Sequence, residues 1–233
     1  DFGDALHEVL RRFHSAWGAE PFHEQAAEEI AASLREHARS VFEPQLARTP
    51  ALFSFARRFD GLVPGYVTWL QQQCREGWRW QAGELKQNRV LPLRHGVQVE
   101  LRGRVDRVDQ HHDGRVQVID YKARAAATLK QGLQMAGEDI QLPFYGALLE
   151  QTAQEAEYLS FDRAKEGEPG VHSIKPPQPF EALTSAVLNR LHQDLQRVAD
   201  DVPLPAIGPD AVCAHCEMRG LCRKDYWEDE LAS

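Results

Sequence analysis

Residues 97–124 read VQVELRGRVDRVDQHHDGRVQVIDYKAR and have the pattern of a β-hairpin. Apolar residues alternate with polar ones in the first half of the stretch, which is typical of a half-buried strand. The segment HHDG, residues 111–114, supplies a turn, and Val116, Val118 and Ile119 carry the chain back. The stretch therefore predicts two antiparallel strands joined by a short loop.

The charged residues of this hairpin fall where its strands end. Asp106 lies near the predicted end of the first strand, and Asp120 and Lys122 lie at the end of the second. Because side chains alternate across a strand, Asp120 and Lys122 point to one face, and antiparallel pairing can bring Asp106 to the same place. Two carboxylates beside a lysine can bind Mg²⁺ or Mn²⁺ and steer an attacking water. The alternative is a solvated charge cluster at a sheet end.

Three strings in fixed order extend the pattern beyond the hairpin. GRVDRVD, VIDYKA and QLPFY resemble the G-x-x-D strand, the D-Y-K strand and the Q-x-x-x-Y helix of the RecB-like branch of the PD-(D/E)xK nuclease superfamily. The likeness covers about residues 1–224. It implies that Asp106 and Asp120 bind the metal with the Tyr121 carbonyl, and that Lys122 positions or activates the water.

Two helical segments add residues to the predicted site. GDALHEVL, near the N-terminus, resembles the G-x-x-x-H-x-x-L helix of RecB-like nucleases, which implies that His7 is a metal ligand. Gln141 and Tyr145 stand four residues apart and share one helical face. The resemblance implies that they support the lysine and the substrate. Glu84, at the head of a predicted strand, is a further candidate for a carboxylate near the metal.

The expected fold is α/β, a restriction-endonuclease-like core with a small mixed β-sheet flanked by helices and a helical N-terminal portion. We expect one nuclease domain over residues 1–233, as a fragment of a longer chain. Its parts are a mainly helical portion (1–83), the nuclease core (84–200) and a cysteine-containing C-terminal staple (201–233). The expected elements are helices over 2–17, 21–39, 51–83 (broken near Gly61 and Pro64), 139–151 and 180–199, strands from 84, 97, 115 and 156 with a short edge strand over 171–174, and a mobile connection over 125–138.

Composition bounds the cellular setting. The 233 residues are 42% hydrophobic and hold no apolar run long enough to cross a membrane. We expect a cytoplasmic protein with no membrane partner. The net charge is −8, but residues 84–149 carry ten basic and eight acidic side chains and form the only basic third. The acidic remainder favours delivery to DNA by a partner over a strong nonspecific clamp.

Three cysteines cluster near the C-terminus as Cys213-x-x-Cys216-x5-Cys222. Such spacing indicates a metal site in a reducing compartment. The string CAHCEMRGLCR resembles the tail of AddB-type nucleases, where three such cysteines join a distant N-terminal one around a [4Fe-4S] cluster. The fourth ligand would then lie upstream of residue 1, with Cys74 as a weaker substitute.

The resemblance implies a Mg²⁺-dependent deoxyribonuclease of AddB type. It would be an exonuclease on single-stranded DNA ends that works in repair or recombination with a helicase domain or subunit. The competing interpretation is a catalytically silent nuclease-fold module that binds DNA ends or scaffolds a helicase. A third is a zinc-dependent interaction domain built around residues 213–222.

Overall fold

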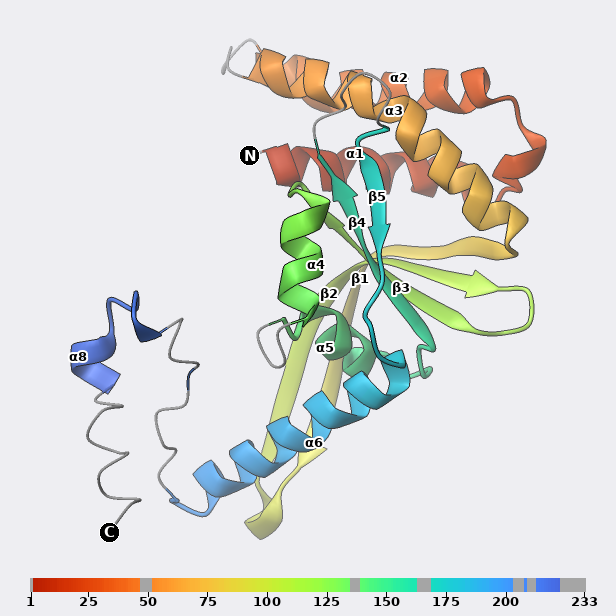
Figure 1. The fold of residues 1–233 in the computed structure, drawn as a ribbon. Coiled ribbons are helices and arrows are strands. Elements are labelled where there is room, and N and C mark those ends of the chain that lie inside the picture. The colour runs from red at the N-terminus through yellow and green to blue at the C-terminus, as the bar shows by residue number, and fades with distance from the viewer. Residues whose placement is uncertain are drawn as a thin grey trace. The chain divides into compact units, whose positions relative to one another are not determined.

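A mixed five-stranded sheet in the order β1-β2-β3-β4-β5 organises the fold (Figure 1). The computed structural model describes residues 2–46, 52–134, 139–162, 169–202, 208 and 213–222. The strands are β1 Trp78–Pro92, β2 Gln98–His111, β3 Val116–Lys122, β4 Glu155–Phe161 and β5 Val171–Ile174. The predicted α/β fold with a small mixed sheet is confirmed.

Chain contacts divide the protein into two units. The first unit comprises residues 1–90 and 100–188, and the second comprises residues 91–99 and 189–233. Every residue predicted for the metal site belongs to the first unit, whereas the three clustered cysteines belong to the second.

The predicted hairpin forms as β2 and β3, which pair antiparallel with Arg107 opposite Ile119. The next pair is parallel, with Asp120 opposite Tyr158 and Lys122 opposite Ser160, and β5 returns antiparallel to β4. Strand β3 is thus central, and six of its seven residues are buried. Both faces of β3 are covered, so its polar residues Gln117 and Asp120 are buried along with its apolar ones.

Three N-terminal helices cover one face of the sheet (Figure 1). They are α1 Phe2–Trp17, α2 Ala27–Leu46 and α3 Leu52–Arg75, with a 3-10 turn η1 at Phe22–Glu24. The apolar stripe of α1, which includes Leu6, Val9 and Phe13, packs in the same core as Ile119 and Leu159. Period-two alternation sends these strand residues toward the helices.

The other face of the sheet packs against shorter helices, α4 Ala126–Gln134 and α5 Gln141–Leu148, and against the start of α6 Phe180–Ala199. Val118 and Tyr158, the alternate residues of the two central strands, contribute to this second core together with Leu142. The helix predicted over 139–151 is therefore present, with shorter bounds. No helix within the described residues has the length and apolar character needed to cross a bilayer.

The predicted break in the helical insert is wrong, because α3 runs unbroken through Gly61, Pro64 and Gly65. Its buried face, which includes Leu62 and Tyr66, packs into the helical core, and this burial outweighs the local helix-breaking signals. Gly65 also permits a close approach. A Cβ there would lie 2.3 Å from the carbonyl oxygen of Pro169.

Two other boundaries also differ from expectation. Helix α3 ends at Arg75, and Gly77, with a φ of 96°, takes the left-handed conformation common just after a helix. Strand β1 therefore begins at Trp78 and not at Glu84. Residues 126–134 form helix α4 with Leu129 buried, where a mobile connection was expected. Residues 135–138 of that connection lie outside the described residues.

In the second unit, the turn η2 at Arg94–Gly96 contacts the C-terminal half of α6. The Arg94 backbone N–H donates a hydrogen bond to Gln196 Oε1 at 2.8 Å, and His95 Nε2 lies 3.4 Å from Asp200 Oδ1. A short helix, α8 Arg219–Cys222, follows near the C-terminus.

Candidate functional site

A cleft of about 720 Å³ in the first unit gathers the predicted residues. Helix α1, strands β1 to β3 and helix α5 all contribute to its walls. Seven of the residues predicted from sequence line it: His7, Glu84, Asp106, Asp120, Lys122, Gln141 and Tyr145. Tyr121, the eighth, contributes main-chain contacts beside it.

Strands β2 and β3 bring the two aspartates to this cleft. Asp120 and Lys122 lie two apart on β3, as the hairpin pattern predicted, and Asp120 is fully buried. Asp106 lies inside β2, which continues to His111, and not near the strand's end. The Tyr121 N–H donates a hydrogen bond to Asp106 Oδ2 at 3.0 Å. The main chain of β3 therefore fixes the Asp106 carboxylate.

Helix α1 presents His7 to the same place. The His7 Nε2 lies 3.0 Å from the Tyr121 carbonyl oxygen, and Nδ1 lies 3.4 Å from Glu84 Oε1 and 3.6 Å from Asp106 Oδ2. One ligand atom from each of His7, Glu84 and Asp106 lies within 4.8 Å of the other two. This grouping unites residues separated by a hundred positions in the chain.

Glu84 reaches the cleft through an unusual backbone conformation. Its φ is 51°, in the left-handed region that residues with a Cβ seldom adopt, although it lies within β1. Such strain persists where the surrounding structure imposes it, often at functional sites. One Glu84 oxygen faces His7, and the other lies 2.9 Å from Arg104 Nε.

Helix α5 supplies the residues that hold the lysine. Gln141 Nε2 donates to Asp120 Oδ1 and to Tyr145 Oη, both at 2.9 Å, while Gln141 Oε1 accepts from Lys122 Nζ at 2.8 Å. The Lys122 Nζ also lies 2.5 Å from Asp120 Oδ2 and 5.4 Å from the centre of the Tyr158 ring. The shared helical face predicted for Gln141 and Tyr145 is therefore directed at Asp120 and Lys122.

The pKa values reflect crowded carboxylates in a buried place. Burial raises the pKa of Asp120 to about 7, with the negative charge of Asp106 adding to the effect, although Lys122 opposes it. Burial also raises the pKa of Asp106. Burial alone lowers the pKa of His7, but Glu84, Asp106 and the Tyr121 carbonyl outweigh it and raise that pKa. A cation among these groups would relieve their mutual repulsion.

The donor set fits a hard divalent cation. Carboxylate oxygens, a carbonyl oxygen and one imidazole nitrogen are ligands for Mg²⁺ and Mn²⁺. Asp120 Oδ2 contacts Lys122 as an ion pair, yet it has no partner at hydrogen-bonding geometry within the described residues. His7, Glu84, Asp106 and Asp120, with the Tyr121 carbonyl, are therefore the residues that would hold such an ion.

A buried charged cluster lies on the opposite face of β2, and sequence reasoning missed it. Arg107 is 1% exposed and donates to both oxygens of Asp109, at 2.6 and 2.7 Å. Its Nη1 also lies 2.9 Å from His14 Nε2 and 3.1 Å from Tyr66 Oη. The cluster joins α1 and α3 to β2. The signal in the sequence was the pair Arg107 and Asp109, two opposite charges at alternate positions of a strand that also holds Val105 and Val108. Alternate positions share a face, so both point away from the face of Asp106.

The cysteine motif belongs to the second unit. Cys213 is half-buried, whereas Cys216 and Cys222 are exposed, and no disulfide joins any of them within the described residues. Among the described residues their sulfurs do not form a group within metal-binding distance of one another. The iron–sulfur cluster stays a prediction of the sequence motif.

Comparison with known proteins identifies the family of this chain. The family model of the PD-(D/E)XK nuclease superfamily matches residues 1–223, so the chain belongs to that superfamily. Membership of this superfamily implies hydrolysis of nucleic acids. The search of curated proteins returned no relative. The solved structure titled "Crystal structure of SSO0001" matches with 15% identity and a TM-score of 0.35 over 81% of this chain and 79% of that one, a likeness too weak to carry an argument.

Proposed function

We propose that the chain is a Mg²⁺- or Mn²⁺-dependent deoxyribonuclease that hydrolyses phosphodiester bonds at the cleft between α1 and α5. The observation that carries this proposal is the grouping of His7, Glu84 and Asp106, whose ligand atoms lie within 4.8 Å of one another. Asp120 and Lys122 line the same cleft, with Lys122 Nζ 2.5 Å from Asp120 Oδ2. The donor set suits a divalent ion. Lys122 contacts Asp120, one of the residues that would hold that ion.

The proposed roles of the residues follow from their positions in the cleft. His7, Glu84, Asp106, Asp120 and the Tyr121 carbonyl would hold the ion, which when bound would polarise a phosphate oxygen and lower the pKa of a water. Lys122 provides a fixed positive charge beside that position, where negative charge develops during phosphoryl transfer.

Helix α5 holds the Lys122 side chain in position through Gln141. Gln141 accepts from Lys122 and donates to Asp120, so it sets the separation of the two groups and orients the Asp120 carboxylate. Tyr145 in turn accepts a hydrogen bond from Gln141. We assign Gln141 and Tyr145 as positioning residues for this reason.

The substrate and setting are finer parts of the proposal. We infer exonuclease action on single-stranded DNA ends, in repair or recombination, with a helicase domain or subunit as partner and an AddB-type relationship. The support is the RecB-like order of motifs, together with the charge distribution of residues 84–149 within an acidic chain. An iron–sulfur cluster at Cys213, Cys216 and Cys222 belongs to the same proposal, and iron and sulfide analysis of anaerobically purified protein checks it.

The test compares wild type with Asp120→Asn and Asp60→Asn. Asp60 is a surface aspartate of α3 paired with Arg35, so its substitution makes the same chemical change away from the cleft. We expect end-labelled single-stranded DNA to be degraded with Mg²⁺ or Mn²⁺ by wild type and Asp60→Asn, and not by Asp120→Asn or after EDTA. Circular dichroism verifies that all three fold.

Two results would contradict the nuclease proposal. Cleavage that survives in Asp120→Asn would place the chemistry elsewhere. Folded wild-type protein that retains DNA but cleaves none with either metal would favour the silent binding module, the interpretation that the net charge of −8 supports.

A further inference from the structure

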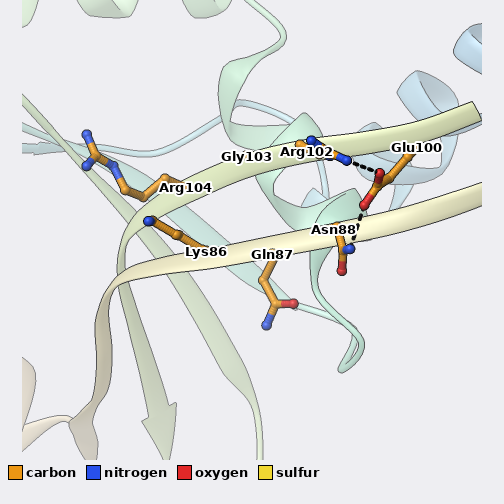
Figure 2. A pocket seen from close by; sticks show the side chains of 7 residues that line it. All are labelled: Lys86, Gln87, Asn88, Glu100, Arg102, Gly103 and Arg104. Atoms are coloured by element: carbon orange, nitrogen blue, oxygen red, sulfur yellow. Dashed lines mark hydrogen bonds and ion pairs between the residues drawn. The ribbon is translucent and has the colours of Figure 1, made fainter.

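A second hollow adjoins the cleft on the exposed face of the β1–β2 hairpin. Its volume is about 770 Å³, and Figure 2 shows the two strands that form it. Seven residues line it: Lys86, Gln87, Asn88, Glu100, Arg102, Gly103 and Arg104. Three of them, Arg102, Gly103 and Arg104, also line the metal-site cleft, so the two hollows meet along β2.

The lining is polar and carries three cations. Arg102 and Arg104 lie two apart on β2, and Lys86 projects from β1 (Figure 2). The side chains of the two arginines are 77% and 63% exposed. Residues two apart on a strand share a face at a spacing of about 7 Å. The cations therefore form a row that leads to the lip of the cleft.

The row keeps a net positive charge, because only two of its three cations are paired with carboxylates. Arg102 lies 2.5 Å from a Glu100 oxygen, and Arg104 pairs with Glu84. Asn88 donates to the other Glu100 oxygen at 2.6 Å, so its amide is also anchored on this face. Lys86 makes no ion pair within the part of the chain that the structure describes.

Arg104 links the row to the metal site. Its Nε lies 2.9 Å from Glu84 Oε2, while Glu84 Oε1 faces His7 at 3.4 Å. One strained carboxylate thus anchors both the imidazole in the cleft and the guanidinium at its entrance. A phosphate held by Arg104 would lie next to the carboxylates that would hold the metal.

We propose that this face of β1 and β2 is the path of the single DNA strand that enters the cleft, and that Lys86, Arg102 and Arg104 hold its phosphates. The proposal rests on the nuclease function proposed above. One row of cations suits one phosphodiester backbone, whereas a duplex presents two. The lining has no aromatic ring for base stacking, so recognition is through phosphates and is independent of base sequence.

The path is tested by binding without cleavage. Fluorescence anisotropy in EDTA measures the affinity of a labelled 20-nucleotide single strand for wild type and for Lys86→Ala/Arg102→Ala. The control, Arg57→Ala/Lys175→Ala, removes two exposed cations of α3 and of the segment after β5. Arg104 is left intact because it contacts Glu84.

The expected change follows from counterion release. For single strands, each phosphate contact makes the slope of log affinity against log salt more negative by about 0.7. Loss of two contacts therefore reduces the magnitude of this slope by about 1.4. The same relation gives a roughly 25-fold loss of affinity at about 0.1 M salt. The control should bind like wild type. Each single substitution, Lys86→Ala or Arg102→Ala, should cost roughly 5-fold if the double variant does not fold.

The outcomes separate the path from the chemistry. Wild type that binds with the expected variant loss, but cleaves nothing, would support the path and contradict the nuclease function. Wild type that cleaves while the double variant binds as tightly as the control would overturn the path alone, and so would the absence of binding by wild type.

Discussion

Replacing Asp109 with asparagine should strongly destabilise the protein, although Asp109 lies outside the cleft. The substitution preserves shape and removes one charge from a pair with side chains 2% and 0% exposed, Arg107 and Asp109. The Arg107 guanidinium would then remain buried without a counter-charge. Its other partners, His14 and Tyr66, are neutral acceptors, and burial lowers the pKa of His14 well below its ordinary value.

The size of the effect follows from the geometry of the pair. Two charge-assisted hydrogen bonds at 2.6 and 2.7 Å join Arg107 to Asp109. Each such bond contributes about 1.5–3 kcal/mol, and breaking a buried ion pair from one side costs about 3–5 kcal/mol. We therefore expect the free energy of unfolding of Asp109→Asn to fall by about 3–5 kcal/mol.

Arg107→Met/Asp109→Leu provides the decisive comparison. It removes both charges and leaves the hydrogen bond between His14 and Tyr66, at 2.6 Å, in place. Because burying an ion pair costs desolvation, an apolar replacement of similar volume is often neutral or stabilising. The double variant should therefore be more stable than Asp109→Asn.

Urea unfolding followed by tryptophan fluorescence measures these differences, with m-values compared to verify that the unfolding transition is the same. Asp60→Asn, which opens an exposed pair with Arg35, should leave the urea midpoint unchanged. The reasoning is refuted if Asp109→Asn unfolds with the midpoint of wild type. It is also refuted if the double variant is as unstable as the single one, because the buried charge would then not be the cause.

Three further predictions concern a buried acid, a close approach and a positioning residue. Burial raises the pKa of Glu157 from 4.5 to about 7, so its contribution to stability is present below pH 4.5 and is lost as pH rises through 7. Glu157→Gln should remove about 3 kcal/mol of that pH dependence, as urea unfolding at pH 5 and pH 8 would reveal, and equal pH dependence in both proteins would contradict it. Gly103→Ala should cost about 1–3 kcal/mol, because the new Cβ would lie 2.4 Å from Leu148 Cδ1; thermal unfolding measures this, and Leu148→Ala in the same chain should relieve the clash. Gln141→Leu should lower nuclease activity by about 10–100-fold by releasing Lys122, with the fold retained by circular dichroism, and unchanged activity would exclude the positioning role.

Local pattern was sufficient for much of the site. The alternation of residues 97–124 predicted the β2–β3 hairpin and the shared face of Asp120 and Lys122, because a period of two follows from strand geometry whatever surrounds the strand. The four-residue spacing of Gln141 and Tyr145 likewise defined a common helical face. The placement of His7 in the same cleft was expected only from the motif resemblance. No local pattern predicts it, because α1 and β3 are far apart in sequence.

Burial overrode local signals elsewhere. Gly61, Pro64 and Gly65 favour a break, yet α3 is continuous because its apolar face is packed in a core that the local sequence does not describe. The same applies to α4, whose Leu129 is buried against the sheet face opposite the N-terminal helices.

The amino-acid sequence by itself determined the hairpin, the D-x-K pair and the membership of a nuclease superfamily, because these depend on neighbours within a few residues or on motifs in order. Only the tertiary structure decided that Glu84 turns toward His7, that Arg107 and Asp109 pair inside a core, and that the cations of β1 and β2 meet the cleft. These features depend on long-range packing and on the cost of leaving a buried charge unpaired, which no local pattern records.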